Sequence, residues 1–348
     1  MKRGILISAV VLLALVVSSG QATAVMQYTI TDLGSFGDNS YAYAINESGQ
    51  VTGWSRTAAG DPHAFLWENG VMRNLGVHYG YDINASAQVV GGHGQLAFLW
   101  ENNSVRYLST LGGASSVAYA INDSGQVVGM AYTPSGDRHA FLWEDGVTTD
   151  LGTLGGSKSE ARGINALGQV VGMAYDENGR YRAFLWEDGV MHNLGTLGGV
   201  FTYAFDINIS GQVVGSSCKG SYNYHAFLWQ DGVMHDLGTL GGDESHGFGI
   251  NASGQIVGSA RTWSGNNRAF VWENGVMYNL DNLIPADSGW DLTTARGIND
   301  LGQIVGSGFH DGEMRAFLLT PIPEPSALGL LAFASLVAIR CLRRRTKH

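Results

Sequence analysis

The sequence predicts an all-β fold built from repeated units of four short strands. The pair Ile-Asn recurs at intervals of 38, 38, 43, 43, 43 and 48 residues, and the repeated asparagines are Asn46, Asn84, Asn122, Asn165, Asn208, Asn251 and Asn299. A period of this size is typical of a four-stranded repeat. The 348 residues include 50 glycines, about twice the usual share, and only 6 prolines. This composition indicates many tight turns between short strands.

Each repeat has the same order of strands and turns. In the third repeat a first strand ends at Ile121, a tight turn follows through Gly125, and QVVGMAY returns as the second strand. We expect HAFLW to form the third strand, and Asp145-Gly146 is typical of the turn to a fourth. The second repeat has Ala87 where the others have glycine. A left-handed backbone there costs about 1 to 2 kcal/mol because of the Cβ atom, so this repeat is expected to be the loosest.

The two ends of the repeat region predict that the repeats close into a ring. The seventh repeat stops after its third strand, RAFLL, at Arg315 to Leu319. The missing fourth strand matches YTITDLGSFG, which starts at Tyr28. A ring closes by pairing these two ends, whereas an open solenoid has no reason to split one repeat. We therefore predict a seven-bladed β-propeller over residues 25–320, closed by the N-terminal strand, with the AYAIN strands and their small residues at a crowded centre.

The third strands carry a repeated tryptophan, and two interpretations of it differ in function. The residues are Trp67, Trp100, Trp143, Trp186, Trp229 and Trp272. They could form a ladder on which a ligand stacks. Burying one between repeats removes about 150 to 250 Å² from water, and stacked units need such a core to cohere. We favour the core, and we likewise interpret the repeated asparagines as turn-forming residues.

The first 24 residues have the three parts of a secretory signal. Lys2 and Arg3 precede an apolar run from Ile5 to Val17, and a small-residue cleavage site ends at Ala24. The apolar run is shorter than the roughly 20 residues that a spanning helix needs, which argues against an uncleaved anchor. We expect signal peptidase to cut after Ala24, so that the mature chain begins at Val25.

The last 28 residues, 321–348, form a second short apolar segment with a basic end. Pro323, Glu324 and Pro325 precede the run Ala327 to Ile339, which is predicted to be a short hydrophobic helix. A basic cluster after it would hold the end on the cytoplasmic side and leave the repeats outside. Its arginines are Arg340, Arg343, Arg344 and Arg345. A permanent tail anchor is the alternative, but 13 residues make a short span.

These motifs resemble two known families. The phrases HAFLWEDGV, INxxGQVVG and LGTLGG resemble the HAF-repeat family of extracellular bacterial proteins over nearly all of Tyr28 to Leu319. That resemblance implies secretion and a repeat fold, and it transfers no catalytic residues. The tail resembles the PEP-CTERM sorting signal of Gram-negative bacteria that make exopolysaccharide. This second resemblance implies an inner-membrane precursor from which an exosortase removes the tail at the Pro-Glu-Pro segment.

Charge and spacing argue against several classes of partner and cofactor. Residues 25–322 hold 13 Lys and Arg against 29 Asp and Glu, and so acidic a surface repels nucleic acid. Cys218 has no second cysteine within the repeats with which to form a disulfide. The ten histidines follow no metal-site spacing, and His63, His139 and His225 stand where other repeats have arginine. We therefore expect no metal and no cofactor.

Aromatic residues outside the repeated core are the candidates for ligand binding. They are Trp54, Trp263, Trp290, Tyr175, Tyr181, Tyr222 and Tyr224. Several are expected in the variable loops between second and third strands, where function is often found. Their flat faces suit the sugars of an extracellular polysaccharide, although aromatic residues can also cover the edges of repeats.

An enzyme would instead need two carboxylates facing a common cleft. Asp243, Glu244, Asp287 and Asp291 break the repeat pattern and are candidates by position only. We predict a binding or structural component of the cell envelope or extracellular polysaccharide matrix without catalytic residues. A polysaccharide-acting glycoside hydrolase or lyase is the alternative.

Overall fold

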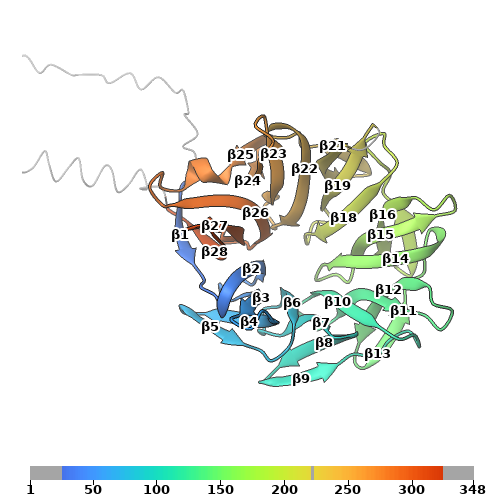
Figure 1. Ribbon diagram of the computed structural model, residues 1–348. Coiled ribbons are helices and arrows are strands. Elements are labelled where there is room, and N and C mark those ends of the chain that lie inside the picture. Colours follow the sequence, from blue (N-terminus) through green and yellow to red (C-terminus); the bar gives the residue numbers. More distant parts are fainter. Residues whose placement is uncertain (1–25, 221–222, 324–348) are drawn as a thin grey trace, which may run out of the picture.

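The computed structural model describes residues 26–220 and 223–323, which form a ring of four-stranded antiparallel sheets (Figure 1). The first sheet contains β2 (Gly37–Ile45), β3 (Val51–Thr57), β4 (Pro62–Glu68) and β5 (Val71–Asn74). The second contains β6 (Tyr79–Ile83), β7 (Val89–His93), β8 (Leu96–Glu101) and β9 (Ser104–Tyr107). The third contains β10 (Ser116–Ile121), β11 (Val127–Tyr132), β12 (Arg138–Glu144) and β13 (Val147–Asp150).

The remaining sheets continue in chain order. The fourth contains β14 (Gly155–Ile164), β15 (Val170–Asp176), β16 (Tyr181–Glu187) and β17 (Val190–Asn193). One parallel pair, Arg138 with Lys158, joins it to the third, so β10 to β17 also form one eight-stranded sheet. The fifth contains β18 (Thr202–Ile207), β19 (Val213–Lys219), β20 (Asn223–Gln230) and β21 (Val233–Asp236). The sixth contains β22 (Gly241–Ile250), β23 (Ile256–Thr262), β24 (Asn267–Glu273) and β25 (Val276–Asn279). A short 3₁₀ helix, η1 (Leu280–Leu283), leads to the last sheet, which contains β26 (Trp290–Ile298), β27 (Ile304–His310) and β28 (Glu313–Pro321).

The last sheet is completed by a strand from the other end of the chain. β1 (Tyr28–Asp32) pairs antiparallel with β28, with Tyr28 opposite Pro321 and Asp32 opposite Phe317. The Tyr28 side chain is buried among residues of the last sheet and the sixth. The predicted pairing of the two ends is therefore confirmed. It covers the edge that β28 would otherwise expose to pairing with other chains.

The core lies between neighbouring sheets. The phenylalanine of each third strand is fully buried, and these residues are Phe65, Phe98, Phe141, Phe184, Phe227, Phe270 and Phe317. The repeated tryptophans pack, buried or half-buried, into the same apolar clusters, so their interpretation as core is confirmed. A repeated glycine in each second strand makes room for a bulge in the first strand. At Gly129 an added Cβ would lie 2.0 Å from the Val117 carbonyl oxygen.

The repeated asparagines form turns and also join one sheet to the next. The Asn122 side-chain oxygen accepts hydrogen bonds from the backbone of Ser124 and Gln126, which confirms the turn-forming role. Its amide nitrogen donates to the Gln126 side chain and to the Asn165 backbone carbonyl at 3.1 Å. The equivalent link recurs at every repeat, each asparagine donating to the next and Asn299 donating to Asn46. This second role was not predicted.

The second repeat keeps the left-handed turn without glycine. Ala87 has φ of 59°, and the glycine at the same place in the third repeat, Gly125, has φ of 81°. The backbone conformation expected at Ala87 is confirmed. A Cβ atom in this conformation costs about 1 to 2 kcal/mol.

Several sequence predictions fall outside the described residues. These are the signal peptide with Ala24, the residue Tyr222, and the sorting tail from Glu324 and Pro325 to the arginines at 340 and 343–345. Pro323 is described and lies exposed just after β28. Within residues 26–220 and 223–323, no helix has the length and apolar character needed to cross a membrane.

Candidate binding site

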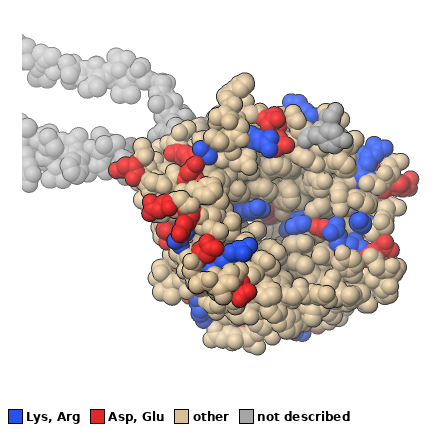
Figure 2. All heavy atoms as spheres, in the orientation of Figure 1, with Lys and Arg blue, Asp and Glu red and all other residues tan. Residues whose placement is uncertain are grey.

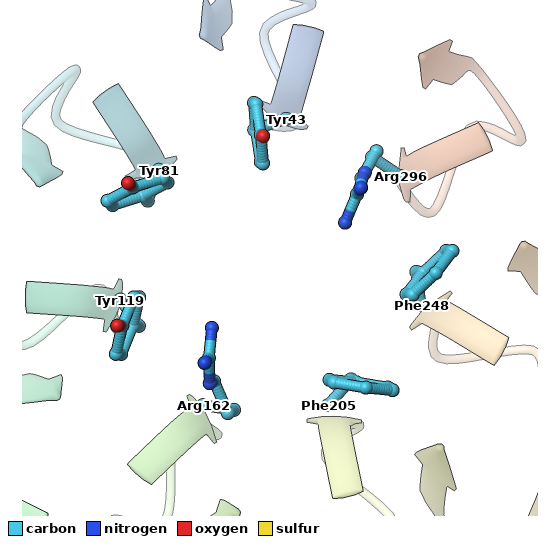
Figure 3. A pocket seen from close by; sticks show the side chains of 7 residues that line it. All are labelled: Tyr43, Tyr81, Tyr119, Arg162, Phe205, Phe248 and Arg296. Carbon is cyan, nitrogen blue, oxygen red and sulfur yellow. The ribbon is translucent and has the colours of Figure 1, made fainter. Parts of the chain in front are cut away.

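A cavity of about 350 Å³ lies at the centre of the ring, where the first strands of the sheets meet (Figure 3). Each lining residue comes three positions before a repeated asparagine, on the strand of its sheet nearest the centre. These residues are Tyr43, Tyr81, Tyr119, Arg162, Phe205, Phe248 and Arg296. The expectation of a centre crowded by small residues is therefore wrong. The small residues follow one position later, as at Gly163, where an added Cβ would lie 3.0 Å from the Asp206 Cα of the next sheet.

The cavity wall is an almost continuous series of aromatic contacts. The rings of Tyr43 and Tyr81 lie 5.5 Å apart between centroids, and so do those of Tyr81 and Tyr119. On the opposite side Phe205 and Phe248 are 5.4 Å apart. Guanidinium groups complete both ends of this series. Arg162 lies 3.9 Å from the Tyr119 ring, while Arg296 lies 4.5 Å from Phe248 and 5.0 Å from Tyr43.

The two arginines of the wall differ in their charge partners. Arg162 forms an ion pair of 2.6 Å with the buried Glu160, and Arg138 forms a second one of 2.6 Å with the same carboxylate. Arg296, in contrast, has no carboxylate within ion-pair distance among the described residues. Burial lowers the pKa of Arg296, an effect that the neighbouring Tyr43 opposes and Arg162 across the cavity reinforces. A guanidinium still keeps its charge near neutral pH, so the cavity carries excess positive charge.

A series of neighbouring aromatic rings crosses the fourth, fifth and sixth sheets and ends at the cavity wall. We define the long track as Tyr175, Tyr181, Tyr203, Tyr224 and His246, whose neighbouring ring centroids lie 4.3, 5.4, 5.8 and 5.7 Å apart. Its last ring stacks 5.9 Å from Phe248 of the wall. The structure thus brings together three predicted residues from two sheets, Tyr175, Tyr181 and Tyr224.

Sequence reasoning missed Tyr203 and His246. Each lies two positions before a cavity residue on the same first strand, and alternation of side chains along a strand could have placed them on the same side.

A shorter track reaches the cavity from the first two sheets. Trp54 stacks on Tyr41 at 4.5 Å and meets the edge of Tyr79 at 5.5 Å. Tyr79 in turn stacks 6.2 Å from Tyr81 of the wall. Trp54 belongs to β3, and its side chain is partly exposed. Among the described candidates only Trp263 lies in a turn, so the expectation that several lie in variable loops is wrong.

The other two predicted tryptophans lie apart from both tracks. Trp290 stacks on His310 at 4.6 Å with the rings nearly parallel, and it packs edge-on against the core residue Phe317. This contact covers the edge of the last sheet. Trp263 lies in the turn after β23, is 91% exposed, and lies against Gly241. Among the described aromatic rings none stacks on Trp263.

The carboxylates considered for catalysis are mostly held by arginines. Asp243 and Glu244 contact the same side chain, Arg261, at 3.4 and 3.1 Å. Asp291 forms an ion pair of 2.8 Å with Arg268. Asp287 lies exposed in the segment between η1 and β26. Asp243, Glu244 and Asp291 are thus paired with arginines at the surface and do not face a common cleft among the described residues.

The histidines at the start of third strands form polar pairs of the same kind. His139 lies 2.8 Å from Asp150 and His225 lies 2.8 Å from Asp236. At the corresponding place in the fourth sheet Arg182 pairs with Asp176 at 3.0 Å. The ring nitrogen Nδ1 of His63 has no hydrogen-bond partner among the described residues.

Comparisons with known proteins bear on the fold. No family model and no curated protein matches the chain. Among solved structures the β-propeller protein YCF48, bound to D1 peptide, matches with a TM-score of 0.52 at 11% identity, over 86% of this chain and 97% of its own. The chain is a β-propeller.

Two other solved structures match more distantly. TolB from Acinetobacter baumannii matches with a TM-score of 0.43 at 14% identity, over 77% of this chain and 79% of its own. The six-bladed fungal lectin of Aleuria aurantia, which recognises fucose, matches with a TM-score of 0.37 at 10% identity, over 73% and 94%.

Proposed function

We propose that this chain is a seven-bladed propeller that binds a glycan at its central cavity and serves as a binding component of the cell envelope or extracellular polysaccharide matrix. The observation that carries the proposal is the convergence of two aromatic tracks on a cavity lined by aromatic rings and guanidinium groups. Flat aromatic faces hold sugar rings by their apolar sides, while arginine and tyrosine donate hydrogen bonds to hydroxyl groups.

The count of seven rests on the repeats and on their closure. Seven asparagine links run from one repeat to the next, and the link from Asn299 to Asn46 returns to the first. The third and fourth sheets touch through a single parallel pair, Arg138 and Lys158, and we count them as two blades.

The proposed location at the cell surface is inferred from the motifs in residues 1–24 and 321–348. We infer cleavage after Ala24, retention of the precursor by the basic tail, and removal of that tail by an exosortase near Pro323, Glu324 and Pro325. The resemblance to HAF repeats and to the PEP-CTERM signal supports this route. Mass spectrometry of the protein from a producing Gram-negative strain tests it, because both processed ends have defined masses. A mature protein that keeps residues 326–348 would contradict the sorting step.

Glycan binding is tested by screening the purified protein on a glycan array together with three variants. Trp54→Ala shortens one track and Tyr181→Ala interrupts the other, whereas Trp263→Ala removes an exposed aromatic residue outside both. We expect the first two to weaken binding about tenfold or more, as loss of a stacking residue does elsewhere, and the third to leave it unchanged. Equal loss in all three variants, or no binding to any glycan, would contradict the proposal.

The enzyme alternative requires product release from the same glycans. The ion pairs of Asp243, Glu244 and Asp291 favour the binding role. Turnover that disappears in Asp243→Asn or Glu244→Gln would overturn this preference.

A further inference from the structure

We propose that the central cavity selects a sugar that bears a carboxylate, a hexuronate residue, and that Arg296 binds this carboxylate. This inference rests on the proposed glycan-binding function and names the ligand class of the same site. It follows from the charge of the cavity, its wall and its size.

The first step is the unmatched charge of Arg296. The chain has 30 acidic and 20 basic residues, yet this central guanidinium has no acidic partner among the residues that the structure describes. It lies between the rings of Phe248 and Tyr43, which attract a cation but cannot neutralise it. A partly buried charge without a counter-ion is unfavourable, so an anion that enters the cavity gains more than it would at the surface.

The second step is that nearby carboxylates are directed elsewhere. Glu160 binds Arg162 and Arg138 at once, so it balances one of two positive charges at that side of the cavity. Asp82 and Asp206 each accept hydrogen bonds from the backbone of the neighbouring sheet, at Ile121 and Ile250 respectively. Figure 2 shows the result, with basic side chains on the wall of the central hollow although the chain as a whole is acidic.

The third step is the match between the wall and a sugar acid. A carboxylate is planar and can accept two parallel hydrogen bonds from one guanidinium. Tyr81 and Tyr119 line the same cavity (Figure 3), and burial raises the pKa of both, which keeps their hydroxyl groups protonated as hydrogen-bond donors. The aromatic faces of Tyr43 and Phe248 beside Arg296 suit the apolar side of a pyranose ring.

The fourth step is size. A cavity of about 350 Å³ lies at the lower end of the range for small-molecule sites, so it accommodates one sugar residue and not a length of polymer. The ligand is therefore a free hexuronate or the terminal residue of an acidic oligosaccharide. In the second case the long track, through His246 and Tyr224, extends from the cavity toward the residues that follow.

The test is titration calorimetry of the purified full-length protein with glucuronate, its methyl ester and a terminal-glucuronate oligosaccharide. The ester keeps the ring and its hydroxyls but removes the charge. We expect both acids to bind about tenfold or more tightly than the ester, and this preference to fall as salt is added. If only the oligosaccharide binds measurably, the ligand is a chain end, and if both acids bind alike, the single residue suffices.

Two variants assign the preference to Arg296. Arg296→Gln removes the charge and keeps a planar donor, and it is expected to reduce the preference for acid over ester to about one. Arg180→Gln removes an exposed arginine from a turn and is the matched control, with the preference expected to stay. Circular dichroism and thermal unfolding check that both variants fold. If Arg296→Gln does not fold, the inference is tested on the unaltered protein alone. A preference for acid over ester that falls as salt is added supports it, and the lack of such a preference refutes it.

Outcomes that overturn this inference differ from those that overturn the proposed function. Equal binding of acid and ester, displacement of glucuronate by inorganic phosphate at equal concentration, or a preference that survives Arg296→Gln would each refute the hexuronate site. Neutral glycans that still bind in a manner dependent on Trp54 and Tyr181 would leave the proposed function standing. Absence of any glycan binding would overturn both.

Discussion

The side-chain amide of Asn299 donates a hydrogen bond of 3.1 Å to the backbone carbonyl of Asn46, which lies 253 residues earlier in the sequence. The same amide donates to Gln303 at 2.8 Å, and the Asn299 side-chain oxygen accepts from the Gln303 backbone at 2.9 Å. One buried side chain thus forms a turn and also joins the last sheet to the first. Turn geometry explains why the residue type is asparagine, and the second bond explains why aspartate would not serve equally well.

Replacing this side chain should destabilise the protein measurably. In Asn299→Ala the buried carbonyl of Asn46 and the Gln303 side chain lose their partners, and we expect a loss of about 2 to 3 kcal/mol in the free energy of unfolding. Urea denaturation measures this change. Asn178→Ala, at an exposed turn, is the control and should cost under about 0.5 kcal/mol. Equal effects in the two variants would mean that the link contributes nothing beyond an ordinary turn.

The strand β1, which completes the last sheet, should contribute more to the free energy of unfolding than its 5 residues suggest. Tyr28→Ala removes a fully buried aromatic side chain, so we expect a loss of about 3 to 5 kcal/mol. Removal of residues 26–34 would also expose the edge of β28, and we expect that protein to associate on size-exclusion chromatography. A monomeric truncated protein with unchanged thermal unfolding would argue against closure by β1.

The turn at Ala87 offers a stabilising substitution. Ala87→Gly removes the Cβ from a left-handed residue but adds freedom to the unfolded chain, so we expect a net gain of about 0.5 to 1 kcal/mol. The reciprocal change, Gly125→Ala in the third repeat, should cost about 1 kcal/mol or more. Both are measured by urea unfolding. Changes of the same sign in the two variants would show that factors other than φ decide this turn.

Stability should fall as pH rises from about 5 to 8 because of Asp82. Burial raises the pKa of Asp82 to about 7, above the value of about 3.9 expected in the unfolded chain. The folded state therefore binds this proton more tightly, and its contribution is fully present below the unfolded pKa and lost as pH passes about 7. Asp206, with a pKa raised to about 6 by burial, acts in the same direction.

The variant Asp82→Asn removes the titration but keeps only one of the two oxygens that accept from the backbone of Ile83 and Ile121, so the pH slope and not the absolute stability is compared. We expect the variant to lose less stability than the unaltered protein between pH 5 and pH 8, as followed by urea midpoints at several pH values. Asp287→Asn, at an exposed position, should leave the slope unchanged. Parallel slopes for Asp82→Asn and the unaltered protein would contradict the assignment.

The repeats predicted the scaffold well, because each periodic feature has a local physical cause. Asn122 and Gly125 specify a turn, the repeated Trp143 position specifies a buried face, and the pattern at Tyr28 identifies the missing strand. All of these follow from residues close together in sequence or from a simple count of strands per repeat.

The cavity could not be predicted in the same way. Its wall is formed by one residue from each repeat, and these residues vary between tyrosine, phenylalanine and arginine. Whether Tyr43 or Ala44 faces the centre depends on the phase of a bulged strand, which the sequence pattern did not fix. The variation at this position, against a background of repeated phrases, was the available signal. Tyr175, Tyr181 and Tyr224 were identified because they are aromatic residues outside the repeated core. The contacts of Tyr181 and Tyr224 with Tyr203 depend on the packing of neighbouring sheets, which the sequence does not show.

The pairing of β1 with β28 also orders events during synthesis. Ribosomes make the amino-terminal partner first and the carboxy-terminal partner last, so a nascent chain holds an unfilled position until almost the whole polypeptide exists. A product that terminates early cannot complete the circle and keeps a bare sheet edge that proteases and chaperones recognise. Because closure comes last, incomplete chains can be recognised and removed, whereas complete chains are protected once β1 pairs with β28.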